Sequence, residues 1–250
     1  MNLIRSAKRL IRRLVGRPTS PAINKVTKEN ATTNSLSDIL RTDLVSRMPV
    51  EQVFQKHVVD GPSYFFNKVL NQADSEYQLR YDLANCLEVS INDVIIVGSA
   101  KLGFSVKTLN FHAFDYQYTK TSNPRHKSDI DVAVVNRRFY EKSIEQIFHL
   151  SRHFDPDWIE KNWRMNLFNN TPKDLFTQYA LYLARGWLRP DFLPNLFYEH
   201  APWRSVCDYW YRKTGRRRTT VGFYSDWTYL KHYQMDHLEK LRYKLNKLDV

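Results

Sequence analysis

The sequence has few cysteines, few glycines and no hydrophobic run long enough to cross a bilayer. Its two cysteines, Cys86 and Cys207, cannot build a disulfide framework, which favours a reducing compartment. No apolar run approaches the ~20 residues of a membrane helix, and no secretory apolar core follows the basic first residues. Seven glycines in 250 residues argue against an all-β chain. We therefore expect a cytoplasmic protein that has no transmembrane segment and is rich in long helices.

Acidic residues are also in the minority. The chain has 26 acidic against 38 basic residues, a formal net charge of +12. A positive field of this size favours anionic partners such as nucleic acid, a membrane surface or nucleotides, with a merely soluble basic protein as the alternative. Hydrophobic residues make up 42% of the chain, which is enough to bury a sizeable core at this length.

Three regions can be distinguished along the chain. Residues 1–33 combine a short basic amphipathic helix with a polar linker. This helix could bind a partner protein, lie on a membrane surface, contact phosphates or pack on its own domain. Residues 34–145 are expected to form the core together with preceding helices, and residues 146–250 a mostly helical region. Apolar or β-branched runs predict strands at 94–97, 130–135 and 216–224, and the segment between the first two, 104–120, predicts a hairpin or an extended excursion. Helical spacing predicts two short helices in 34–58 and further helices over 64–88, 138–153, 157–168, 173–186, 202–213 and 226–248.

Two aspartates occur at the start of the second apolar run. Asp129 and Asp131, in "SDIDVAVV", are two residues apart, so in a strand they point to the same face. Adjacent carboxylates repel each other unless a cation lies between them, and Mg²⁺ prefers one or two carboxylates plus substrate phosphates. We therefore take both as candidate catalytic residues and as ligands of Mg²⁺ or Mn²⁺. A solvated pair at the rim of a sheet, without function, is the alternative.

A Gly-Ser turn follows the first strand, in "VGSAKLGFS". Gly98 would allow the backbone to approach a phosphate closely, and Ser99 offers a hydroxyl group. The turn lacks the spacing of a P-loop. Its indication of nucleotide binding therefore depends on the aspartates of the next strand.

The strand, the Gly-Ser turn and "SDIDVAVV" together resemble the core signature of the nucleotidyltransferase superfamily related to DNA polymerase beta, over roughly residues 80–140. The resemblance implies an α/β (α+β) fold: a small mixed β-sheet, the minimal nucleotidyltransferase core, flanked by N-terminal helices and a C-terminal helical region. It also implies that Gly98 and Ser99 hold the triphosphate of an NTP, while Asp129 and Asp131 hold the divalent metal ions.

Two features depart from the pattern of this superfamily. The spacer between Ser99 and Asp129 is longer than in most members, which is tolerable if it forms a surface hairpin. Active members also bring a third acid from a later strand, and the late strand of this chain contains none. Asp226, Asp191 and Asp115 are candidates for that role, and none has a clear claim.

The segment "LARGWLRPDFLP" is dense in arginine, tryptophan and proline. Arg185 and Arg189 are candidates for binding the phosphates of a nucleic acid, and Trp187 for stacking on a base, although the end of a helix would also explain the segment. His149 and His153 have a spacing that can bind zinc, but no third ligand is evident, which favours an ordinary helix end.

The densest basic cluster, Arg216, Arg217 and Arg218, lies close to several tyrosines. Basic and aromatic residues together suit RNA, with a solvated turn as the alternative. The sequence therefore predicts an Mg-dependent nucleotidyltransferase that moves a nucleotidyl group from an NTP to an acceptor, which the positive charge suggests is RNA, for instance tRNA. The resemblance also implies a setting in bacterial toxin–antitoxin or antiphage systems. Two alternatives stay open: a nucleotide second-messenger synthase, and a catalytically silent module that binds nucleic acid or a partner protein.

Overall fold

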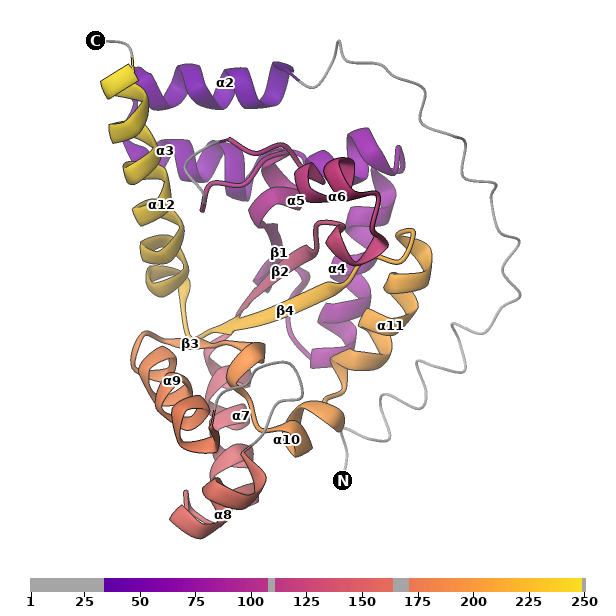
Figure 1. Ribbon diagram of the computed structural model, residues 1–250, viewed down its shortest axis with the longest axis vertical. Coiled ribbons are helices and arrows are strands. Elements are labelled where there is room, and N and C mark those ends of the chain that lie inside the picture. Colours follow the sequence, from indigo (N-terminus) through magenta and orange to yellow (C-terminus); the bar gives the residue numbers. More distant parts are fainter. Residues whose placement is uncertain (1–33, 108–110, 164–170, 249–250) are drawn as a thin grey trace.

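A four-stranded mixed sheet lies at the centre of the protein, with helices on both of its faces (Figure 1). The computed structural model describes residues 34–107, 111–163 and 171–248. The helix and linker expected in residues 1–33 lie outside these residues. The α+β class predicted from the sequence is confirmed.

The strands follow the order β1-β2-β4-β3 across the sheet. β1 (Val94–Val97) is antiparallel to β2 (Ile130–Val135), β2 is parallel to β4 (Thr219–Tyr224), and the short β3 (Trp187–Leu188) is antiparallel to β4. The strands predicted at 94–97 and 130–135 are confirmed, whereas the predicted strand 216–224 begins only at Thr219. Strands from both sides of residue 145 form this one sheet.

Alternation along β2 divides the core into two layers. Ile130, Val132 and Val134 belong to a cluster that includes residues of α4 (Asp74–Leu87), α7 (Arg137–Leu150) and α11 (Trp203–Lys213). Ala133 and Val135 belong to a cluster with α2 (Asn34–Val45), α3 (Val50–Phe54) and α12 (Trp227–Leu248). Both faces of the strand are thus covered, which explains why its sequence is almost continuously apolar. Asp131 shares its face with Ala133 and Val135.

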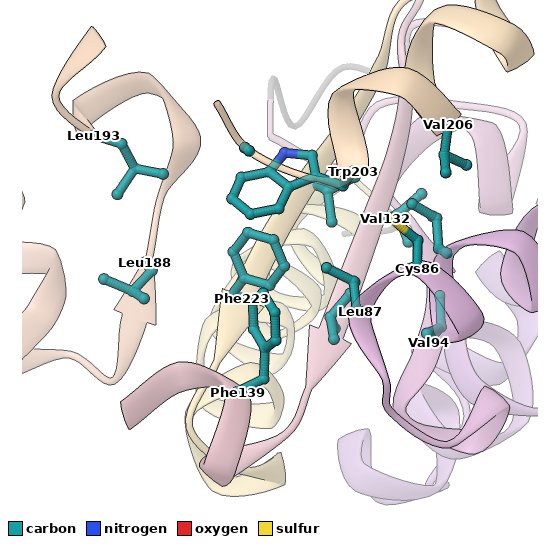
Figure 2. Packing of buried hydrophobic residues seen from close by; sticks show 14 of the residues in the cluster. Cys86, Leu87, Val94, Val132, Phe139, Leu188, Leu193, Trp203, Val206 and Phe223 are labelled. Carbon is teal, nitrogen blue, oxygen red and sulfur yellow. The ribbon is translucent and has the colours of Figure 1, made fainter. Parts of the chain in front are cut away.

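Aromatic residues fill the first of these layers. Figure 2 shows Phe223 of β4 packed between Phe139 and Trp203, with ring centroids 4.8 and 4.6 Å from its own. Pairs at this separation contribute to stability beyond the area that they bury. The high aromatic content of the chain is therefore largely a property of its core.

The helices before the sheet are α2 (Asn34–Val45), α3 (Val50–Phe54), the π-helical turns η1 (Gln55–Val59) and η2 (Phe65–Val69), α4 (Asp74–Leu87) and the 3-10 turn η3 (Ile91–Asp93). Between β1 and β2 lie α5 (Gly98–Leu102), α6 (Tyr116–Thr121) and η4 (Pro124–His126). After β2 come α7 (Arg137–Leu150), α8 (Pro156–Asn162), α9 (Pro172–Ala184), η5 (Pro190–Phe192), α10 (Asn195–Glu199), α11 (Trp203–Lys213) and α12 (Trp227–Leu248).

Most predicted helices are present, and several begin at local capping signals. The Asn136 side chain accepts a hydrogen bond from the N–H of Phe139, and Thr171 forms a capping box with Asp174. The excursion after β1 forms short helices and a single bridge between Phe104 and Ala113 instead of a regular hairpin. Within the described ranges, no helix is long and apolar enough to span a membrane.

Candidate active site

Asp131 lies directly beside the Gly98 turn. It is the second residue of β2, and the antiparallel register places it opposite Val97, the last residue of β1. Gly98 has φ +68°, and a Cβ added there would lie only 2.8 Å from Oδ2 of Asp131. The left-handed backbone favours glycine, and the absence of a side chain lets the carboxylate of Asp131 lie against the turn. The structure thus brings together the two motifs that carry the resemblance.

Ser99 follows in the first turn of α5. It is half-buried, and its carbonyl oxygen accepts a hydrogen bond from the N–H of Gly103 at 2.9 Å. Gly103 also has a positive φ and ends the helix. This short helix keeps Ser99 next to Gly98 at the end of β1.

β4 supplies a hydroxyl group to the site. Thr220 lies beside Asp131 in the parallel register, and its Oγ1 donates a hydrogen bond to Oδ1 of Asp131 at 2.6 Å. The bond holds one carboxylate oxygen against the sheet, while the other lies toward Gly98. Sequence reasoning missed Thr220, because the register of two strands far apart in the chain has no local signal.

Asp129 forms an ion pair with Arg218. Nη2 and Nε of Arg218 lie 2.5 and 3.1 Å from Oδ2 of Asp129, and the two side chains are 58% and 29% exposed, respectively. Burial raises the pKa of Asp129 above its ordinary value, although the hydrogen bond from Arg218 acts in the opposite direction. The carboxylate is thus partly withdrawn from water, and a cation is favourable beside it.

The three candidates for a third acid differ in their surroundings. Asp115 forms a buried ion pair with Arg217, and Asp226 accepts a hydrogen bond from the N–H of Thr228 at 2.7 Å at the start of α12. Asp191, in η5, pairs with Arg189 at 2.8 Å, and its charge raises the pKa of Asp129 as a minor cause behind burial. In the described part of the chain, no group of three or more acidic, histidine or cysteine residues is arranged to hold a metal ion.

Arg189 is packed among aromatic rings. Its guanidinium carbon lies 5.3, 5.6 and 4.9 Å from the ring centroids of Tyr182, Trp187 and Phe192. Trp187 itself stacks on Tyr224 at 5.2 Å, so its ring is engaged within the protein. Arg185, at the end of α9, is exposed.

The arginines of the basic cluster have different environments. Arg216 is exposed, and Arg218 binds Asp129. Arg217 is only 6% exposed and pairs with Asp115, which removes it from the residues that could contact nucleic acid. His149 and His153 lie at the end of α7 with ring centroids 5.8 Å apart, and His153 stacks on Phe148.

Comparisons of the chain with models of protein families, with curated proteins and with solved structures find no match.

Proposed function

We propose that the protein binds an NTP with Mg²⁺ or Mn²⁺ at Asp129 and Asp131 and transfers its nucleotidyl group to an acceptor. The observation that carries this proposal is the approach of Gly98 to Asp131, 2.8 Å from a Cβ position to Oδ2. It leaves a backbone turn without a side chain next to the carboxylate of Asp131, two residues after that of Asp129. This donor set fits Mg²⁺, which binds one or two carboxylates when phosphate oxygens complete its coordination.

In the proposed reaction an acceptor hydroxyl attacks the α-phosphorus of the NTP. A new P–O bond forms, the bond between the α-phosphorus and the oxygen bridging to the β-phosphorus breaks, and pyrophosphate leaves with that bonding pair. The bound metal supplies charge neutralisation for the triphosphate. Asp129 and Asp131 hold and orient this unit, and the hydroxyl proton passes to a third acid or to water.

A basic surface next to the site supports RNA as the acceptor. It comprises residues 116–128 and 209–218, neither of which contains an acidic residue. The two segments lie side by side (Figure 1), joined by a 2.8 Å hydrogen bond from Nζ of Lys127 to the carbonyl oxygen of Gly215. The surface reaches the site at Arg218, the partner of Asp129. Its exposed cations are Lys120, Arg125, Arg212, Lys213, Arg216 and Arg218.

Tyrosines alternate with cations on this surface. The ammonium groups of Lys120 and Lys213 lie 4.3 and 5.6 Å from the ring centroids of Tyr116 and Tyr209. Positive charge binds the phosphate backbone, and aromatic rings stack on unpaired bases. This combination supports a single-stranded RNA segment that leads to the carboxylates.

A catalytically silent module is the second candidate, and one observation favours it. β4 lies beside β2 but presents Thr220, a hydroxyl group, next to Asp131 where an acid would complete the site. A site of this kind could bind a metal–nucleotide complex and leave its bonds intact.

The proposal is tested by incubating the protein with each α-labelled NTP and Mg²⁺, with and without total RNA. Label on RNA supports RNA nucleotidyl transfer, and a small labelled product supports a second-messenger synthase. Asp131→Asn should abolish either label, since the neutral amide is a poor metal ligand yet can still accept the bond from Thr220. Asp38→Asn, an exposed aspartate on α2, is the matched control. Nucleotide binding without label supports the silent module, and a fully active Asp131→Asn variant would refute the metal site.

The RNA acceptor is tested separately by binding of a single-stranded oligonucleotide. Lys120→Gln combined with Arg125→Gln should weaken binding and reduce its salt dependence. Arg138→Gln combined with Lys142→Gln removes the same charge from exposed positions on α7 and should have a smaller effect. Equal effects of the two double variants would show that net charge alone is responsible.

A further inference from the structure

Arg218 and Asp129 occupy equivalent places at the ends of two neighbouring strands. Asp129 directly precedes β2, and Arg218 directly precedes β4. The N–H of Ile130 donates a hydrogen bond to the carbonyl oxygen of Arg218 at 2.8 Å. The backbone therefore holds the two side chains opposite each other, and their ion pair follows from the parallel register of the sheet.

The guanidinium competes with any metal ion for Asp129. Both of its short contacts, at 2.5 and 3.1 Å, are made to the same oxygen, Oδ2. A divalent cation bound through that oxygen would have to displace them or lie close to a positive charge. In the free protein Asp129 is consequently neutralised by an internal cation.

Arg218 has an alternative partner once a triphosphate is present. Its side chain is 58% exposed, so it is not enclosed by the protein. The planar guanidinium matches phosphate oxygens with two parallel hydrogen bonds. Moving from Asp129 to a phosphate would keep the arginine paired and free the carboxylate for the metal.

We propose that Arg218 forms an ion pair with Asp129 in the free protein. When metal and nucleotide bind together, the arginine side chain leaves Asp129 and binds the triphosphate. The inference rests on the function proposed above and adds a dependence between its two ligands. The metal alone binds weakly because Arg218 holds Asp129. Metal and triphosphate bind cooperatively because the phosphates remove that competitor.

Two binding measurements test this inference without any need for turnover. The first titrates the protein with Mn²⁺ alone and follows free Mn²⁺ by electron paramagnetic resonance. The second titrates it by calorimetry with inorganic triphosphate in excess Mg²⁺, which avoids the unknown base preference. The proteins compared are the unmodified chain, Arg218→Gln, the control Arg216→Gln and the site variant Asp131→Asn.

Arg218→Gln should bind Mn²⁺ alone roughly fivefold more tightly, the factor that corresponds to the loss of a partly exposed ion pair. It should bind magnesium triphosphate more weakly than the unmodified chain. Arg216→Gln removes the same charge from the neighbouring exposed position and should change both affinities less. Opposite changes in the two affinities identify a competitor that becomes a ligand, because a merely structural role would lower both.

Equal effects of Arg218→Gln and Arg216→Gln, or a loss of both affinities in Arg218→Gln, would overturn the inference. If Asp131→Asn loses Mn²⁺ binding while Arg218→Gln binds Mn²⁺ as the unmodified chain does, only the proposed role of Arg218 fails, and the proposed site stands. If none of the four proteins binds Mn²⁺, or if Asp131→Asn binds it as tightly as the unmodified chain, the proposed function fails together with the inference.

Discussion

Replacing Gly98 by alanine separates the two reasons why glycine is needed there. At φ +68° an alanine would have to adopt the left-handed backbone conformation, which costs about 1–2 kcal/mol of stability. The new methyl group would also lie 2.8 Å from Oδ2 of Asp131. That oxygen is the end of a side chain, so it can rotate away, and this contact adds little to the loss of stability. The rotation would, however, pull the carboxylate away from its proposed metal-binding position and from Thr220.

Gly215 provides the matched control. It has almost the same backbone angle, φ +67°, but a Cβ added there would meet nothing within 4 Å. Gly215→Ala should therefore show the backbone cost alone. Both variants should lose roughly 2–4 °C of melting temperature for each kcal/mol, whereas only Gly98→Ala should lose Mn²⁺ affinity, by about tenfold or more.

Differential scanning calorimetry and Mn²⁺ titration measure the two effects. Gly98→Ala combined with Asp131→Ala removes the close contact, and relative to Asp131→Ala alone it should lose about as much stability as Gly215→Ala loses relative to the unmodified chain. If Gly98→Ala keeps full Mn²⁺ and nucleotide affinity, the turn does not position the carboxylate, and the observation on which the proposed function rests has no functional meaning.

Three further predictions concern the neighbouring groups. Thr220→Val removes the hydrogen bond from the hydroxyl group to Asp131 and should lower the free energy of unfolding, measured with a denaturant, by about 1 kcal/mol. It should also weaken Mn²⁺ binding about tenfold. An unchanged Mn²⁺ affinity would contradict a positioning role for Thr220. Because burial raises the pKa of Asp129, its ionised form is disfavoured in the folded protein. The stability of the unmodified chain should therefore fall relative to that of Asp129→Asn as the pH rises above 3.8 toward the raised pKa. Thermal unfolding between pH 4 and 7 would show the melting temperature of the unmodified chain falling relative to that of the variant, and a relative rise would contradict the sign. Burial also raises the pKa of Cys86 from 9.0 to about 11 and that of Cys207 from 9.0 to about 12. Because the thiolate is the reactive form, a disulfide reagent at pH 8 should label both thiols at least about 100-fold more slowly in the native than in the unfolded chain.

The sequence predicts β1 and β2 because each has a local signal, whereas the contact between their motifs was implied by the resemblance. A short β-branched run before Gly98 is a strand, and the spacing of Asp129 and Asp131 places both carboxylates on one face in any strand. The antiparallel pairing of β1 and β2 then brings the turn to the aspartates. Only this pairing had to be supplied by the resemblance.

The arginine partners of Asp115 and Asp129, which directly precede β4, could not be predicted from a local signal. Arg217 and Arg218 are adjacent and chemically identical, yet one is buried against Asp115 and the other binds Asp129. Successive side chains point in opposite directions as the chain enters a strand, so their roles depend on the register of β4 against β2. That register joins residues that are far apart in the sequence and has no local pattern.

The long excursion between the two motifs explains how this arrangement is kept in place. Asp115 and Ser128 form reciprocal hydrogen bonds, with the Asp115 N–H donating to Ser128 Oγ at 2.9 Å and the Ser128 N–H donating to Asp115 Oδ1 at 2.8 Å. Arg217 binds both Asp115 and the carbonyl oxygen of Ser128. The end of the excursion is therefore fixed one residue before Asp129, by an ion pair to the segment that leads into β4.

This arrangement changes the meaning of the long spacer. A longer loop adds only a small entropic cost for closure, and the tie between Asp115 and Ser128 divides the excursion into two shorter loops. Because the tie involves Arg217 and the next residue is Arg218, the same turn holds the excursion and presents the competitor for Asp129. A change in the excursion that weakened the ion pair between Asp115 and Arg217 would therefore alter the position of Arg218 relative to Asp129. It would do so although the excursion contributes no side chain to the proposed metal site.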